Sequence, residues 1–425
     1  MNQQNKINKL NVYYEDILIG KLVRDKELVC SFSYSENWLK YPDKFQLSLV
    51  MPFQKEPFGN RVTLSFFENL LPEGETRAIL EKSQHVKGSF DFLKKFGKDC
   101  AGAIIISPES SSPYKKTEGK EVKIEIEQIY QAIDQKQSVA EIIAEKHQGY
   151  LSIAGAQDKF SAIFKEESFY IPTNGRPTTH IIKLPIYRSN IRESVYNEYY
   201  CMRLAKLVGL NVPDCKVLDD NNHPLFITKR FDRFKGTDGK IHRIHQQDFC
   251  QAQGIVSEQK YEEKGGPSLK DNYELIKANV TIKKRPSTLF AYLDWICFNL
   301  LIGNNDSHSK NISFLLNNHK IELSPFYDLI CTAIYPKLNK NFSFMIGDRD
   351  DASKIGKNQL EMIDSNLSLR QGTMKERILM MSDKLKKHKN ALADEIKAEF
   401  NQAKIINEIA DLIGKRCRSL KRQGL

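Results

Sequence analysis

The alternation of apolar and polar residues in the first hundred positions predicts a β-rich region. Residues 11–19 and 27–34 alternate with the two-residue period of strands that bury one face. Residues 63–71 are largely apolar and end at Pro72-Glu73-Gly74, a combination that stops regular structure. Residues 101–106 are small or apolar throughout and predict one more buried strand.

A change of composition follows this last strand. Residues 107–113 are rich in serine and proline, and residues 115–123 are dominated by charge, which is typical of a linker. We therefore predict a domain or subdomain boundary near residues 107–123. The predicted division is a β-rich N-terminal subdomain at 1–110, a linker with a helical connection at 111–150, a core of strands and one helix at 151–235, and a helical region at 236–425.

The third of these parts combines short strands with a single strong helix. Apolar runs predict strands at residues 160–164, 169–171, 179–184 and 225–229. Apolar residues recur at helical spacing across residues 195–208, and a glycine at position 209 marks the end of that helix.

From about residue 245 the pattern becomes mostly helical. Pro286 marks the start of a helix whose apolar stripe covers residues 289–301, and Gly303 ends it. Residues 312–316 and 320–323 then alternate on either side of an asparagine-rich turn, which predicts a hairpin.

The most informative residues follow that helix directly. Asp306 stands five positions before Asn311, and Asp328 follows seventeen positions after Asn311. Phosphoryl transfer from ATP needs a carboxylate that orients the attacking hydroxyl, with an amide and a second carboxylate that hold Mg²⁺. Protein kinases place these groups at a similar spacing. Asp306 taken singly would be a turn former, but the three together predict a kinase. Asn311 and Asp328 bracket the predicted hairpin and would share one magnesium.

Other polar residues extend this interpretation. The alternatives for His308 are a metal ligand, a second base, or a residue that packs against the loop or touches a phosphate.

Lys183, near the end of a predicted strand, can reach the α- and β-phosphates if a carboxylate positions it. Glu198 on the following helix is the first choice for that carboxylate, and Glu193 is the second. A surface salt bridge is the structural alternative for the lysine and its partner.

Residues 152–159, with the sequence Ser-Ile-Ala-Gly-Ala-Gln-Asp-Lys, come just before a predicted strand. Their small side chains would let backbone N–H groups approach phosphates. The segment contains one glycine, and it is neither a Walker A motif nor the glycine-rich loop of eukaryotic kinases. A tight turn explains it equally well.

Composition narrows the class of protein. The chain has 425 residues, of which 40% are hydrophobic and 28% charged, and it shows no apolar run of the roughly 18 residues that a membrane span requires. The polar N-terminus predicts no secretory signal. Eight cysteines are scattered without a CxxC pair, which argues against a zinc site and a disulfide framework. We expect a cytoplasmic protein that does not bind a membrane.

The net charge of +11 suggests attraction to polyanions without identifying one. Basic residues gather at positions 384–389 and again at 415–422. These clusters are either nucleic-acid contacts or, more simply, a solvated helix face and a terminal tail.

At these motifs the chain resembles the HipA family of bacterial serine/threonine toxin kinases. The resemblance is carried by FFENLLPEG at 66–74, SIAGAQDK at 152–159, THIIKLPI at 179–186, NEYYCMRLAKLVGLNVPD at 197–214, RFDR at 230–233, the Asp306/His308/Asn311 loop and SPFYD at 324–328. It covers roughly residues 10–415. It implies an α+β, protein-kinase-like bilobal fold with a β-rich N-terminal subdomain, an ATP-binding small-lobe core and a mostly helical catalytic C-terminal lobe.

The resemblance also implies cofactors and residue roles. ATP and Mg²⁺ would be the cofactors, Asp306 the catalytic aspartate, Asn311 and Asp328 the magnesium ligands, and Lys183 a contact to the ATP phosphates. Ser152 matches the family's autophosphorylated serine, and a phosphate there would repel nucleotide and give an inactive form. The residues implied in ATP binding are Ala154, Gly155, Ala156, Gln157, Asp158, Lys159, Lys183, Lys229, Arg230, Phe231, His308, Ser309, Lys310, Asn311, Tyr327 and Asp328. Of these, residues 229–231 would be the hinge that meets adenine through its backbone. A well-studied member is acidic where this chain has Lys229, so no side-chain contact is carried over there.

Partners follow from the same resemblance. They are a small helix-turn-helix antitoxin, operator DNA bound through the antitoxin complex, and a protein substrate of the aminoacyl-tRNA synthetase class. Two rival interpretations stay open: a small-molecule or lipid kinase, which shares the catalytic triplet, and a catalytically silent nucleotide-binding module of a DNA-bound repressor complex.

Overall fold

The chain folds into two compact units. The computed structural model describes residues 8–111, 119–146, 154–155, 157–187, 190–220, 222–317 and 320–422. The first unit comprises Met1–Leu184, Thr228–Ser257 and Ser313–Lys320, and the second comprises Pro185–Ile227, Glu258–Ile312 and Ile321–Leu425. The predicted boundary near residues 107–123 falls within the first unit, and the four-part division stays a prediction.

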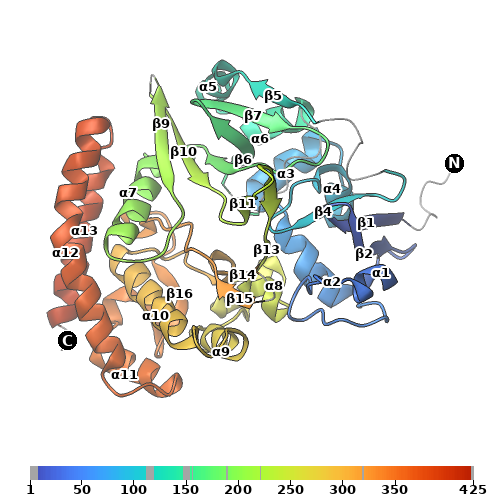
Figure 1. Ribbon diagram of the computed structural model, residues 1–425. Helices are drawn as coiled ribbons and strands as arrows, with labels where there is room; N and C mark the ends of the chain where they lie inside the picture. Colours follow the sequence, from blue (N-terminus) through green and yellow to red (C-terminus); the bar gives the residue numbers. More distant parts are fainter. Residues whose placement is uncertain are drawn as a thin grey trace. The chain divides into compact units, whose positions relative to one another are not determined.

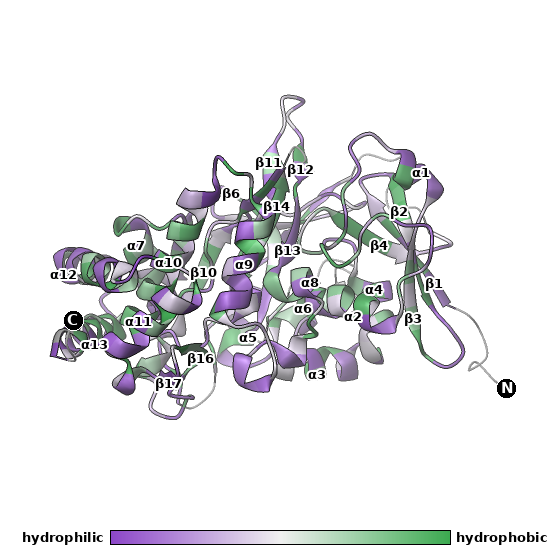
Figure 2. Ribbon diagram, turned by 90° about the horizontal axis from the view of Figure 1, so that it is seen from below, coloured by the Kyte–Doolittle hydropathy of each residue, from purple (hydrophilic) through white to green (hydrophobic). Residues whose placement is uncertain are grey.

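The first unit contains an antiparallel sheet with the order β3-β2-β1-β4 (Figure 1). Its strands are β1 (Asn8–Tyr14), β2 (Ile17–Arg24), β3 (Cys30–Tyr34) and β4 (Ile104–Pro108). Leu10 pairs with Leu22, and Val12 pairs with Ile106, and all four side chains are buried. In Figure 2, β4 is coloured hydrophobic along much of its length. The predicted strand at 101–106 is confirmed with a shifted start.

Two sequence predictions in this sheet are wrong in their boundaries. The predicted strand at 11–19 is two strands, because the chain turns at Glu15, which adopts a left-handed conformation with φ of 50°. The strand predicted at 27–34 begins only at Cys30. The Asp25 carboxylate accepts hydrogen bonds from the N–H groups of Glu27 and Val29, each at 2.9 Å, and this Asx-type turn replaces the first residues of the strand.

Short helices accompany this sheet in the first unit. They are α1 (Glu36–Lys40), α2 (Asn60–Phe67), α3 (Gly74–Ser83) and α4 (Gly88–Phe96). The apolar stretch at 63–71 is helical, and it buries Phe66, Phe67 and Leu70.

The first unit also contains strands in the order β5-β7-β6-β8. They are β5 (Glu121–Ile124), β6 (Lys159–Lys165), β7 (Ser168–Pro172) and β8 (His180–Lys183), accompanied by α5 (Ile126–Asp134) and α6 (Val139–Lys146). The strands predicted at 160–164, 169–171 and 179–184 are confirmed. Further along the chain this unit contains β11 (Arg233–Lys235), β12 (Ile241–Arg243), β13 (His245–Asp248), α8 (Phe249–Gln253) and β14 (Ser313–Asn317).

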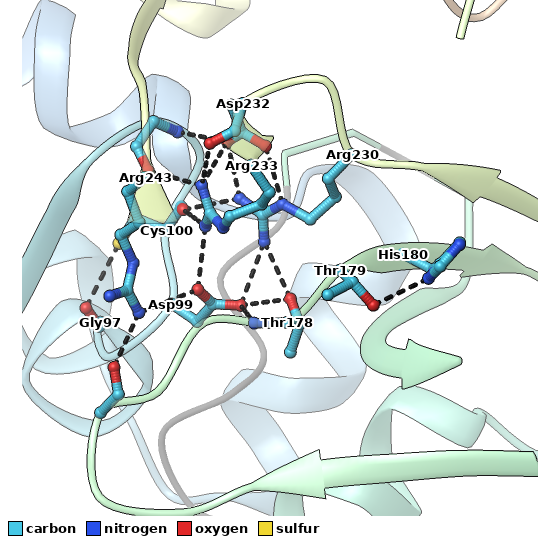
Figure 3. A network of polar contacts seen from close by, with 12 residues as sticks. Gly97, Asp99, Cys100, Thr178, Thr179, His180, Arg230, Asp232, Arg233 and Arg243 are labelled. Carbon is cyan, nitrogen blue, oxygen red and sulfur yellow. Dashed lines mark hydrogen bonds and ion pairs between the residues drawn. The ribbon is translucent and has the colours of Figure 1, made fainter. Parts of the chain in front are cut away.

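A buried cluster of charges joins distant segments of the first unit (Figure 3). Asp99, fully buried, accepts hydrogen bonds from Arg230 at 3.1 Å, Arg233 at 2.9 Å and Arg243 at 3.3 Å. Arg230 also binds both carboxylate oxygens of Asp232, through Nε at 2.9 Å and Nη2 at 2.8 Å. Bidentate pairs of this kind fix orientation as well as charge.

The cluster decides the protonation of its members. Burial alone would raise the pKa of Asp99, but the charges of Arg230, Arg233 and Arg243 together lower it well below its usual range. Burial, with repulsion from Arg230, lowers the pKa of Arg233 to about 10. The Asp232 carboxylate also accepts the Gly102 N–H at 2.8 Å. Residues 99–102 are therefore tied to the segment that follows β10 (His223–Lys229).

The second unit is mostly helical, as predicted for the chain beyond residue 245. Its helices are α7 (Ser194–Leu207), α9 (Leu269–Asn279), α10 (Arg285–Ile302), α11 (Lys357–Asn366), α12 (Thr373–Glu399) and α13 (Ile405–Arg422). It also holds β9 (Cys215–Asp220), most of β10 and β15 (Lys320–Leu323), β16 (Asn341–Ile346) and β17 (Arg349–Asp351). α12 packs against α7, α10 and α13. Among the helices of the described ranges, none is long and apolar enough to cross a membrane.

The buried cluster gives a first testable prediction. Replacing Asp99 with Asn should lower the free energy of unfolding by about 3–5 kcal/mol, because it leaves the single carboxylate of Asp232 to balance three buried guanidinium groups. Since the native pKa of Asp99 is lowered, its stabilisation is complete at neutral pH and is lost as the pH falls below about 4. Urea denaturation at several pH values measures both effects. Glu109→Gln, at an exposed pair with Lys21, is the control and should change little. Equal stability of wild type and Asp99→Asn at pH 7 would contradict the prediction.

Candidate active site

The candidate catalytic loop starts where α10 ends. Gly303 caps the helix in a left-handed conformation with φ of 77°, as a residue without Cβ does readily. The chain then turns at once into Asn304. Its side chain is buried, with 1% exposure.

Asn304 links three parts of the second unit through one amide. Its Oδ1 accepts the Asp306 N–H at 3.2 Å. Its Nδ2 donates to Asn299 Oδ1 at 2.8 Å and to the Asp328 carbonyl at 3.4 Å. The sequence analysis did not single out Asn304. The sequence feature that could have identified it is a pair of asparagines directly after a buried apolar helix.

Asp306 and Asn311 are held against each other. Asn311 Nδ2 donates to the Asp306 carbonyl at 2.9 Å. The Asn311 side chain is therefore fixed by its nitrogen, and its Oδ1 accepts no hydrogen bond from any described residue. The Asp306 side chain is half exposed, at 53%. A fixed amide oxygen beside an exposed carboxylate suits a hard cation and a hydroxyl group.

Asp328 adopts a left-handed conformation with φ of 59°, which is uncommon for a residue with a Cβ and is maintained by its surroundings. Asn304 holds its carbonyl on one side. Tyr327 donates from its hydroxyl to the Lys310 carbonyl at 2.7 Å. Past the turn, Cys331 exchanges two hydrogen bonds with the Asn197 side chain, at 2.8 and 3.0 Å. Asp306, Asn311 and Asp328 thus belong to one hydrogen-bonded network within the second unit, and their roles in catalysis and metal binding stay a prediction.

The other predicted residues of this loop have distinct surroundings. His308 is buried, and its Nε2 lies 3.9 Å from Asp306 Oδ1. Ser309 exchanges hydrogen bonds with Asn272 of α9, at 3.0 and 3.3 Å. Tyr261, which sequence reasoning missed, donates from its hydroxyl to Asp306 Oδ1 at 2.7 Å. No spacing rule links it to a residue 45 positions away.

The predicted phosphate loop lies in the first unit. Ser152 and Ala156 lie outside the described residues. Gly155 has φ of 112°, and its carbonyl accepts the Glu73 N–H at 3.0 Å, so the N-terminal subdomain contacts this loop. Gln157 donates from Nε2 to the Leu184 carbonyl at 2.6 Å, which occupies its side chain.

Asp158 has a structural role at this position. Its carboxylate accepts the N–H groups of Val139 at 2.8 Å and Ala140 at 3.2 Å, and the Ser138 hydroxyl at 3.2 Å. It thereby satisfies the first N–H groups of α6. Burial raises the pKa of Asp158 despite these donors. The Asp158 carboxylate is occupied by these donors and has no hydrogen to donate to a phosphate. Only its backbone could therefore contact a nucleotide.

Two lysines face each other in the sheet beside that loop. Lys159 of β6 and Lys183 of β8 are cross-strand partners, and Lys183 is only 6% exposed. Glu198 is buried in α7 of the second unit, and its pairing with Lys183 stays a prediction.

The predicted hinge is built by the buried charge cluster. The Arg230 N–H donates to the Thr179 carbonyl at 2.9 Å, and its guanidinium is engaged with Asp99 and Asp232. The Arg230 side chain therefore has a structural role. The backbone carbonyl of Arg230 is the group that could contact the adenine base. Lys229 is exposed.

Two family models match the chain. The model of the HipA-like C-terminal domain matches residues 151–403, and the model of the HipA N-terminal domain matches residues 10–107. The chain belongs to the HipA family. The resemblance stated from the motifs is confirmed.

Individual HipA-family relatives agree with this assignment. Y4mE of Sinorhizobium fredii, named as a kinase, is 31% identical over 421 residues, covering 98% of this chain and 99% of that protein. The serine/threonine-protein kinase toxin HipA of Shewanella oneidensis is 30% identical over 373 residues, covering 85% and 83%. A solved complex of Shewanella oneidensis HipA, HipB and operator DNA matches with a TM-score of 0.82 at 26% identity, covering 97% of both chains. The predicted α+β, kinase-like fold is confirmed, and the chain is a HipA-family kinase.

The Asn304 network yields a prediction of its own. Asn304→Ala should lower the free energy of unfolding by about 1–3 kcal/mol, because it leaves buried partners of the amide without hydrogen bonds. Asn304→Asp should be at least as damaging, since a carboxylate cannot donate to Asn299 or Asp328. Chemical denaturation measures both variants.

The matched control for that experiment is Asn366→Ala, at an exposed position of α11. It should stay within about 0.5 kcal/mol of wild type. An Asn304→Ala variant as stable as Asn366→Ala would show that the loop does not depend on the amide.

Proposed function

We propose that this HipA-family kinase transfers the γ-phosphoryl group of ATP to a protein serine. The observation that supports this most is the network in which Asn304 and Asn311 hold Asp306 and Asp328. Asp306 would accept the substrate hydroxyl, and Asn311 Oδ1 with the Asp328 carboxylate would hold Mg²⁺, which takes oxygen ligands. The metal would neutralise the charge of the phosphates, while the side chains of the loop keep the attacking hydroxyl in line.

The first unit would supply the nucleotide contacts. The facing lysines, Lys159 and Lys183, are suited to phosphate oxygens. The loop at 154–159 would contribute backbone N–H groups, since the side chains of Gln157 and Asp158 are engaged elsewhere. The segment 229–231 would meet adenine through backbone groups.

Regulation and partners belong to the same proposal. Autophosphorylation of Ser152 would place a charged group in the phosphate loop and inactivate the enzyme. The Shewanella oneidensis relative is solved with HipB and operator DNA, which supports a helix-turn-helix antitoxin and operator DNA as partners here. The basic residues of α12 and α13 would favour that DNA. The substrate would be a protein of the aminoacyl-tRNA synthetase class.

The experiment compares wild type with Asp306→Asn after incubation of dephosphorylated protein with Mg²⁺-ATP. Intact-mass spectrometry should show one added phosphate on the wild type, mapped to Ser152 by peptide analysis. The variant should react about 10²–10⁴-fold more slowly, because it lacks the carboxylate that orients the hydroxyl.

Asp411→Asn makes the same chemical change at an exposed position of α13 and should react like wild type. If neither wild type nor control gains mass or turns over ATP with any protein, the silent-module alternative holds. Transfer to a small molecule but to no protein would instead favour the small-molecule kinase.

A further inference from the structure

We infer that Tyr261 is a positioning residue for Asp306, an inference that rests on the proposed function. The Tyr261 hydroxyl donates to Asp306 Oδ1 at 2.7 Å. Among the residues that the structure describes, none donates a hydrogen bond to the other oxygen, Oδ2. The tyrosine thereby selects one orientation of an otherwise half-exposed carboxylate and directs Oδ2 to the substrate hydroxyl.

The tyrosine ring is itself fixed against the catalytic loop. It meets the His308 ring edge-on, with centroids 5.2 Å apart and an angle of 81° between the planes. His308 is 5% exposed, so it forms a rigid support. An aromatic pair in this geometry restricts rotation of the ring and keeps the hydroxyl directed at Asp306.

The loop that carries Tyr261 is closed by its own backbone. The Tyr261 carbonyl accepts the N–H groups of Lys264 at 3.0 Å and Gly266 at 2.9 Å. Gly266 is required for this closure, since a Cβ at that position would come within 2.1 Å of the Gln259 carbonyl. Gly265 adds a left-handed turn with φ of 82°. The loop is a built turn and not a flexible segment that happens to touch Asp306.

One strand anchors both partners of the contact. Glu262, next to the tyrosine, accepts the Met345 N–H of β16 at 2.8 Å. On the same strand, Ser343 donates to the carbonyl of Asn305, the residue before Asp306, at 2.7 Å. β16 therefore sets the spacing between the tyrosine loop and the catalytic loop. Burial raises the pKa of Glu262, in agreement with its place under the turn.

This arrangement has a chemical consequence for the proposed transfer. A carboxylate that rotates freely offers the substrate hydroxyl two oxygens in changing positions, whereas the tyrosine leaves one oxygen at a fixed place. Orientation of this kind acts on the chemical step more than on nucleotide binding.

The test separates the hydroxyl from the ring. Tyr261→Phe removes only the hydroxyl, and Tyr261→Ala removes both. We expect Tyr261→Phe to lower the kcat of phosphoryl transfer about tenfold, because it removes a hydrogen bond to a charged group. Tyr261→Ala should be impaired at least as much. KM for ATP should stay within twofold, because the hydroxyl orients the carboxylate and does not contact the nucleotide. The Tm of Tyr261→Phe should match that of wild type.

Tyr273→Phe is the matched control, since it removes a hydroxyl from α9 for which the structure shows no hydrogen bond. It should leave both kcat and the KM for ATP unchanged. A Tyr261→Phe enzyme with wild-type kcat would overturn the inference, and a defect confined to Tyr261→Ala would assign the ring a packing role only. A wild-type protein without any transfer activity would contradict the proposed function itself, and so the two failures are distinguishable.

Discussion

A single buried amide, that of Asn304, holds together the groups to which the proposed chemistry of this protein is assigned. Its oxygen binds the backbone of Asp306, and its nitrogen binds both the helix α10, through Asn299, and the carbonyl of Asp328. Two carboxylates that are 22 positions apart in the sequence are thereby related by one rigid group. Both the oxygen and the nitrogen of this buried amide have hydrogen-bond partners, which offsets the cost of burying it. The left-handed conformation of Asp328 is maintained by the same contacts.

In the first unit, buried charged side chains hold together segments that lie far apart in the sequence. Asp99 and Asp232 gather three buried arginines, and this fixes the predicted hinge to the segment at 99–102. Segments from the first 110 residues therefore contact both the predicted hinge, through Asp99, and the predicted phosphate loop, through the hydrogen bond from Glu73 to Gly155. A buried ion cluster of this kind specifies geometry more than it adds stability.

Much of this could be predicted from the sequence, for reasons that particular residues make clear. The proposed catalytic residues Asp306, Asn311 and Asp328 could be singled out because they lie close in the chain at a characteristic spacing. Most strands and α10 were found from periodicity. Tyr261 and Asn304 were missed, because a contact across 45 positions or a buried amide leaves no periodic signal. The motifs also could not show whether the side chain or the backbone of a residue is available to contact a nucleotide. Asp158 and Arg230 were implied as nucleotide-binding residues, yet their side chains cap α6 and complete the ion cluster.

The most direct test of the account is a crystal structure of the protein with Mg²⁺ and a non-hydrolysable ATP analogue. We predict a metal ion bound by Asn311 Oδ1 and the Asp328 carboxylate at about 2.1 Å, with Tyr261 still bound to Asp306 Oδ1. A nucleotide whose metal is held by other residues, with Asn311 turned away, would contradict the central claim that the Asn304 network assembles a phosphoryl-transfer site.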